Sequence, residues 1–198
     1  MEEPSWHKFI DDCPDYHRLH DNYPKAHVKQ KFYGFYKHNY LKKNKLLFNQ
    51  FREIFVLKNK LAGFKDEEFF YNKPSDGILP RINIHHYPIG GGYQAAHIDP
   101  NGPHAQIQTL IVASIFNEDF HSGGLFTCKE LNGEKFYLDH YTSVGDMIVM
   151  SPAIPHGVDV INETESYSPN TNNGRWIIIP LFLHSDYPGP ENIKPKQL

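Results

Sequence analysis

The pattern of hydrophobic positions changes near residue 81 and divides the chain into two parts. Beyond it, short runs rich in Ile and Val alternate with Gly, Pro, Asn and Asp, which is typical of short strands separated by turns. These runs are Arg81–Tyr87, Gln106–Phe116, Gly124–Lys129, Lys135–Leu138, Asp146–Met150, Gly157–Ile161 and Arg175–Phe182. Strands of this number and length predict a barrel or a sandwich. The polar stretch Asn162–Gly174 is expected to form a long turn between two strands.

The N-terminal part follows a different periodicity. Between Lys25 and Lys60, apolar residues recur at three- and four-residue steps, which predicts one or two amphipathic helices. Their apolar face would consist of Phe32, Phe35, Tyr36, Tyr40, Leu47, Phe51, Ile54 and Phe55. The same stretch holds ten Lys and Arg against the single acid Glu53, which favours a solvated basic face over a patch for an acidic partner.

Length and composition narrow the class of protein. A chain of 198 residues suits one domain, with a helical support region over 1–80, a β core over 81–185 and an extended tail over 186–198. A formal net charge of −3 argues against a nucleic-acid binder, and no apolar run is long enough to span a membrane. The acidic N-terminus does not resemble a secretory signal, and two cysteines in all suit a reducing, cytoplasmic setting.

The strongest chemical signal is the tripeptide His97-Ile98-Asp99. In an extended segment, residues two apart point to the same side, so this imidazole and this carboxylate would face one point. His156, 57 residues after Asp99 in a proline-shaped loop, is the best candidate for a third ligand. Two histidines and one carboxylate form the facial triad of non-haem Fe(II) oxygenases, which leaves coordination positions open.

A second signal is Arg175, which opens the final apolar run 19 residues after His156. An arginine that enters a buried strand is costly unless an anion pairs with it, and its planar fork suits a carboxylate. The alternative is an arginine at a strand edge that reaches solvent.

Together these segments resemble the 2-oxoglutarate- and Fe(II)-dependent oxygenases, and most closely their prolyl 4-hydroxylase-like branch. The resemblance covers residues 81–183 and rests on Tyr87-Pro-x-Gly, His97-x-Asp99, Asn117-x-Asp-Phe with Ser122-Gly-Gly, Gly145-Asp, His156-Gly-Val and Gly174-Arg-Trp. It implies a mainly β fold with N-terminal α-helices, built on a double-stranded β-helix, or jelly roll, with helices packed on one sheet.

The resemblance also implies roles for individual residues. His97, Asp99 and His156 would bind Fe(II), Arg175 would bind the distal carboxylate of 2-oxoglutarate, and Tyr87 would line the co-substrate pocket. The branch usually has a shorter spacing before the basic residue, and the polar stretch after His156 would accommodate the difference as a lengthened hairpin. The tyrosine that often assists the arginine is missing near Ser114 and Ile115, and Thr109 is the substitute candidate.

The implied activity is hydroxylation of an unactivated C–H bond, with Fe(II), 2-oxoglutarate, O2 and ascorbate as cofactors and co-substrates and with succinate and CO2 as co-products. Retention of Asp99 favours hydroxylation over halogenation. The substrate would be a prolyl or other protein residue; a free amino acid or other small molecule is the alternative. A non-enzymatic cupin-like binding domain is a further alternative, because a fold does not imply a function.

Candidate substrate residues follow from strand alternation. Alternation places Arg81, Asn83, His85 and Tyr87 on one side of their strand. If Tyr87 faces the interior, Asn83 and His85 do too, and they would contact substrate or form an internal hydrogen-bond network. Gln94 and the ring of Tyr93 are expected at the mouth of the site.

Overall fold

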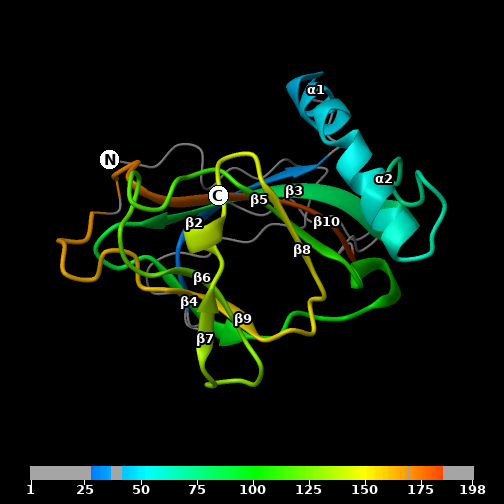
Figure 1. Ribbon diagram of the computed structural model, residues 1–198. Coiled ribbons are helices and arrows are strands. Elements are labelled where there is room, and N and C mark those ends of the chain that lie inside the picture. Colours follow the sequence, from blue (N-terminus) through cyan, green and yellow to red (C-terminus); the bar gives the residue numbers. More distant parts are fainter. Residues whose placement is uncertain (1–27, 37–41, 169, 185–198) are drawn as a thin grey trace, which may run out of the picture.

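The computed structural model describes residues 28–36, 42–168 and 170–184. Two antiparallel sheets of five strands each face one another, as Figure 1 shows. The first sheet has the order β2-β3-β10-β5-β8 and the second has the order β1-β4-β9-β6-β7. The expected fold class, a jelly-roll core with helices beside one sheet, is confirmed.

The first sheet is built around its two longest strands, β3 (Ile78–Pro88) and β10 (Gly174–His184), which pair along their whole lengths. β2 (Lys31–Tyr36) flanks β3, while β5 (Gln108–Val112) and then β8 (Met147–Met150) flank β10. β-Branched residues, Ile82 and Ile84 in β3 and Ile177–Ile179 in β10, favour this extended pairing.

The second sheet consists of shorter strands. These are β1 (Val28–Lys29), β4 (Tyr93–His97), β9 (His156–Asp159), β6 (Gly124–Cys128) and β7 (Lys135–Tyr137). Between the end of β9 at Asp159 and the start of β10 at Gly174, the described residues form no helix or strand, which agrees with the long turn expected over Asn162–Gly174 except for Gly174 itself. Among the described residues, no helix is long and apolar enough to cross a membrane.

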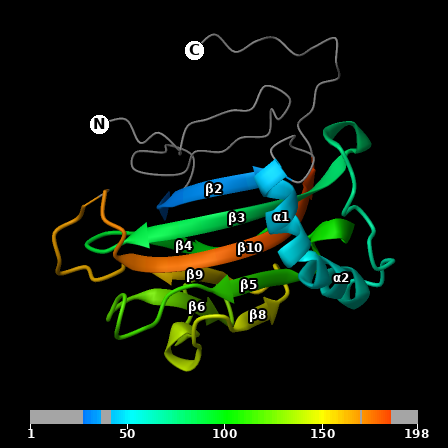
Figure 2. The same ribbon diagram turned by 90° about the horizontal axis from the view of Figure 1, so that it is seen from above.

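Two helices, α1 (Lys42–Gln50) and α2 (Arg52–Leu61), follow β2, and Figure 2 shows them lying across one end of the first sheet. Their aromatic side chains meet side chains of that sheet in a fully buried cluster: Phe48, Phe55, Phe70, Ile82 and Phe182. Of the predicted apolar face of these helices, Phe55 lies in the cluster and Leu47 and Phe51 pack against it, whereas Ile54 does not. The prediction of helix was wrong for residues 28–36, which form β1 and β2, and residues 25–27 and 37–41 lie outside the described ranges.

Three short 3-10 helices, Pro74–Asp76, Pro103–Ala105 and Asp139–Tyr141, lie in the connections between strands. The acidic N-terminus and the tail over 186–198 lie outside the described residues, so their predicted character stays a prediction.

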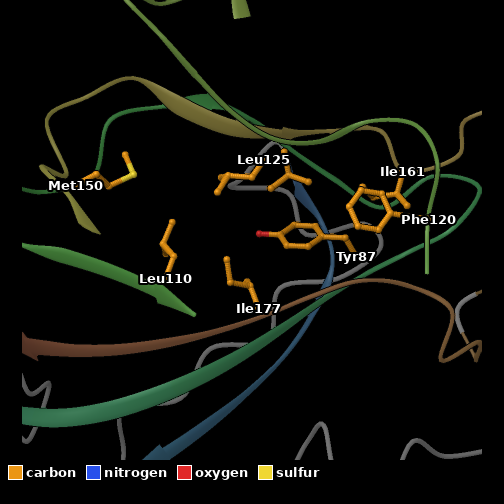
Figure 3. Packing of buried hydrophobic residues seen from close by; sticks show 8 residues of the cluster. Tyr87, Leu110, Phe120, Leu125, Met150, Ile161 and Ile177 are labelled. Carbon is orange, nitrogen blue, oxygen red and sulfur yellow. The ribbon is translucent and has the colours of Figure 1, made fainter. Parts of the chain in front are cut away.

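A second buried cluster fills one part of the space between the sheets: Tyr87, Leu110, Phe120, Leu125, Met150, Val158, Ile161 and Ile177. Figure 3 shows the ring of Tyr87 between Leu125 and Ile177, with its hydroxyl turned away from Phe120 and Ile161. Another part of the space between the sheets forms a cavity lined by residues of both sheets.

Candidate functional site

The three predicted ligands come together where β4 and β9 meet. His97, the last residue of β4, is the cross-strand partner of His156, the first residue of β9, and their ring centroids are 4.4 Å apart. Asp99 follows two residues later and is held by a hydrogen bond from its backbone N–H to the carbonyl of Pro152. Among the described residues, these three form the group whose donor atoms lie close enough to hold a metal ion.

Both imidazoles are oriented by the backbone. Nδ1 of His97 lies 2.9 Å from the carbonyl oxygen of Ala95, and Nδ1 of His156 lies 2.8 Å from that of Ile154. A carbonyl only accepts, so each Nδ1 carries the proton and each Nε2 keeps its lone pair for a ligand. Such outer contacts are the usual way in which a metal-binding histidine is fixed.

The carboxylate of Asp99 faces both Nε2 atoms. Its Oδ1 is 3.4 Å from Nε2 of His97 and its Oδ2 is 3.5 Å from Nε2 of His156. Around a divalent ion with bonds of about 2.1 Å, neighbouring ligands stand about 3 Å apart and opposite ligands about 4.2 Å. The two separations lie about 0.5 Å above that neighbouring value and near the roughly 3.4 Å expected of tetrahedral ligands, so the three groups can converge on one divalent ion. The donor set of two histidines and one carboxylate is the one that non-haem Fe(II) sites use.

The electrostatics of Asp99 suit this role. Burial alone would raise the pKa of Asp99, but the neighbouring imidazoles of His156 and His97 lower it below its usual range. The amide of Gln108 also donates to Oδ2 of Asp99 at 2.8 Å. The carboxyl group is therefore ionised at neutral pH and held by a neighbouring side chain, as a metal ligand requires.

The triad opens into a cavity of about 430 Å³ between the two sheets, and Arg175 lines one end of it. Arg175 is the second residue of β10, pairs with Tyr87 of β3 and is 1% exposed. Its Nε and Nη2 donate to the two carboxylate oxygens of Asp139 at 2.6 and 2.9 Å. Asp139 also accepts the backbone N–H of Leu125 at 2.6 Å, which fixes the carboxylate.

The carboxylate of Asp139 therefore provides one anionic partner for Arg175 from within the chain. A guanidinium carries five N–H donors, and Asp139 takes two of them, which leaves three for another acceptor. Asp139 was missed from the sequence, because the requirement for an anion beside Arg175 did not indicate which of several acidic residues would supply it. In the structure it fills the supporting position for which Thr109 was the candidate.

Thr109 does not line the cavity, so its prediction as a co-substrate contact was wrong. Gln108 and Leu110 face the cavity, and alternation along β5 turns Thr109 to the opposite face, where it is fully buried. Its hydroxyl donates to the carbonyl of Pro180 at 3.1 Å. Pro180 has no N–H for the ladder, and the threonine ties β5 to β10 at that point.

The predicted alternation along β3 is confirmed, because Arg81, Asn83, His85 and Tyr87 all line the cavity. Burial, helped by the charges of Arg81 and Arg175, lowers the pKa of His85 to about 3, so this ring is neutral. Burial likewise raises the pKa of Tyr87 above its usual range, and its phenol stays protonated.

Tyr87 and Gln94 connect the two ends of the site. The hydroxyl of Tyr87 donates to Oε1 of Gln94 at 2.8 Å, and Nε2 of Gln94 lies 3.2 Å from Nε2 of His97. Gln94 therefore lines the cavity as expected. Tyr93 does not: its side chain lines a separate, smaller pocket, because neighbouring residues of β4 point to opposite faces.

Comparisons with known proteins were made for the whole chain. No family model and no curated protein matches it. Solved structures similar to it include a 2OG-Fe(II) oxygenase family oxidoreductase from Burkholderia pseudomallei, with 14% identity and a TM-score of 0.49, covering 79% of this chain and 68% of that one. A Pseudomonas putida prolyl-4-hydroxylase has 12% identity and a TM-score of 0.47, covering 80% and 74%.

A prolyl hydroxylase from Trichoplax adhaerens, solved with a hypoxia inducible factor oxygen degradation domain peptide fragment, has 14% identity and a TM-score of 0.49, covering 85% of this chain and 69% of that one. At these identities and TM-scores the chemistry has to be argued from the site of this chain itself.

Proposed function

We propose that the protein is an Fe(II)- and 2-oxoglutarate-dependent dioxygenase that hydroxylates an unactivated C–H bond. One observation carries the proposal: a two-histidine, one-carboxylate triad and a buried arginine with spare donors line the same cavity. The reaction converts 2-oxoglutarate, O2 and a substrate C–H into succinate, CO2 and the alcohol.

In this proposal, His97, Asp99 and His156 hold Fe(II), and Arg175 binds the distal carboxylate of 2-oxoglutarate. With the metal and 2-oxoglutarate bound, O2 would be the oxidant, and oxidative decarboxylation of 2-oxoglutarate and hydroxylation of the C–H bond would each supply two electrons. The chain fixes its own groups: backbone carbonyls hold both Nδ1 protons, Gln108 orients Asp99, and Asp139 orients the arginine. A binding domain without catalysis would not need two histidines and an ionised carboxylate to converge on one point of the cavity.

The proposal is tested by following succinate formation from 2-oxoglutarate in the presence of Fe(II), O2 and ascorbate. We expect wild-type protein to form succinate and His156→Ala to form none. His121→Ala is the matched control, because His121 is an exposed histidine outside the cavity. Absence of succinate from folded, iron-loaded wild-type protein, or equal rates in wild type and His156→Ala, would contradict the proposal.

A further inference from the structure

The cavity extends beyond the triad, away from Arg175. Along β10, alternate residues face inward from Arg175 to Leu183, and Leu183 pairs with Leu79 at the far end of β3. β5 pairs with β10 where Val112 lies opposite Ile177 and Ile111 opposite Ile178, and the same register extended along β5 puts Gln108 opposite Leu181. Gln108 in turn donates a hydrogen bond to Asp99. The predicted metal ligands therefore lie between Arg175 and the far end of the cavity, and part of the cavity volume lies on the side of the ligands away from Arg175.

A buried cation lines this far space. Lys58 of α2 is 4% exposed, and its ammonium donates to the carbonyl of Ile107, the residue before β5. Among the described residues, no carboxylate forms an ion pair with Lys58, and Asp99 is the single acidic residue that lines the cavity. Burial lowers the pKa of Lys58 to about 8, so the group is still charged at neutral pH.

A desolvated ammonium with only a carbonyl for a partner is unfavourable unless an anion joins it. One carbonyl uses one of its three N–H donors, and two remain. His104 and His184, whose ring centroids are 4.4 Å apart, line the same end of the cavity and bring no negative charge of their own. The anion would therefore come from a bound molecule.

The same cavity also holds acceptors without donors. The side-chain carbonyl oxygens of Gln108, Asn83 and Gln30 are buried and have no hydrogen-bond partner, and all three residues line the cavity. The orientation of Gln108 is fixed, because its amide nitrogen donates to Asp99. Buried acceptors of this kind are normally satisfied, so a ligand that fits them brings N–H or O–H groups.

Resting on the proposed function, we infer that the substrate is a small carboxylic acid with N–H or O–H donors, such as a free amino acid or hydroxy acid, whose carboxylate pairs with Lys58. The donors of the substrate satisfy the amide oxygens of Gln108 and its neighbours. A cavity of about 430 Å³ that also takes 2-oxoglutarate holds a molecule of this size.

The test is calorimetric titration under anaerobic conditions into full-length protein already holding Fe(II) and 2-oxoglutarate. The probes are the twenty free L-amino acids and their 2-hydroxy acid counterparts, each as the acid and as the carboxamide, and blocked tripeptides with Glu or Ala at the centre. Formation of the visible charge-transfer band with Fe(II) and 2-oxoglutarate is recorded first, so that a failure of the proposed function is seen separately.

We expect at least one free acid to bind, its amide to bind roughly 30-fold or more weakly, and Lys58→Met to remove that difference. The control Lys60→Met removes the same charge from an exposed position of α2, where Lys60 pairs with Asp66, and should bind the acid as wild type does. If the band forms normally but no free acid binds, the inference is wrong. It is also wrong if acid and amide bind alike, if Lys58→Met binds the acid unchanged, or if only the tripeptides bind.

Discussion

Replacing Lys58 with methionine should stabilise the ligand-free protein at pH 7. The lysine is 4% exposed, and burial lowers its pKa from 10.5 to about 8, a difference that corresponds to about 3 kcal/mol against the charged form. The methionine removes that cost but leaves the carbonyl of Ile107 without its donor, which costs about 1 kcal/mol. The expected net gain is about 2 kcal/mol.

The sign of the pH dependence follows from the same pKa. Between pH 8 and 10.5 the unfolded wild-type chain keeps the Lys58 proton while the folded chain has lost it, so wild-type stability rises with pH. Lys58→Met lacks this proton, and every other titrating group is common to both chains. The advantage of the variant over wild type should therefore disappear across this range.

The assay is urea denaturation of both chains at pH 7 and at several values up to 10.5, compared as the difference in free energy of unfolding. Lys60→Met is the control and should differ from wild type by less than about 0.5 kcal/mol without a trend in pH. A variant that is less stable than wild type at pH 7, or a difference that stays constant with pH, would refute a desolvated cation at Lys58.

Other predictions concern the metal ligands, the arginine and the core. Gln108→Ala should weaken Mn(II) binding about 10- to 100-fold in a metal titration, whereas Thr109→Val should leave it unchanged; equal losses would contradict the two faces given to β5. Asp139→Asn should lower the free energy of unfolding by about 3–5 kcal/mol because it leaves Arg175 buried without its carboxylate. The paired change Asp139→Leu with Arg175→Met should cost far less, and a cost as large as that of the single change would count against a structural ion pair. Phe55→Ala should cost about 3–5 kcal/mol in urea unfolding, because Phe55 is fully buried against Phe48, Phe70 and Phe182. Leu46→Ala, at a residue 67% exposed, should cost less than about 0.5 kcal/mol, and similar losses for the two would contradict the helix packing.

The second half of the chain was largely predictable because its strands carry strong local signals. Each of the predicted runs overlaps a strand of the structure: β3, β5, β6, β7, β8, β9 and β10. β4 was not predicted as a strand, because its sequence Tyr-Gln-Ala-Ala-His has no β-branched residue and its pairing with β9 depends on contacts distant in sequence. Residues 28–36 were read as helix, because a dense run of aromatic and lysine residues fits both periodicities.

Site residues were predictable where their spacing along one segment determines on which side of the sheet their side chains lie. His97 ends β4 and Asp99 lies two residues beyond it, and the row from Arg81 to Tyr87 follows one strand. Thr109 and Tyr93 failed for the same physical reason, since an error of one position turns a strand residue to the opposite side of the sheet. Lys58 lines the cavity from a helix, and Asp139 contacts Arg175 from the connection after β7. No local pattern in the sequence indicates such long-range contacts.

The central claim is that the triad and Arg175 together hold Fe(II) and 2-oxoglutarate. The most direct measurement is anaerobic addition of both to the purified protein while the visible metal-to-ligand charge-transfer band is recorded. The structure predicts a band that His97→Ala abolishes and Arg175→Ala weakens, the latter through a higher concentration of 2-oxoglutarate at half-saturation. Folded wild-type protein that binds Fe(II) and 2-oxoglutarate without a band, or that binds neither, would contradict the account.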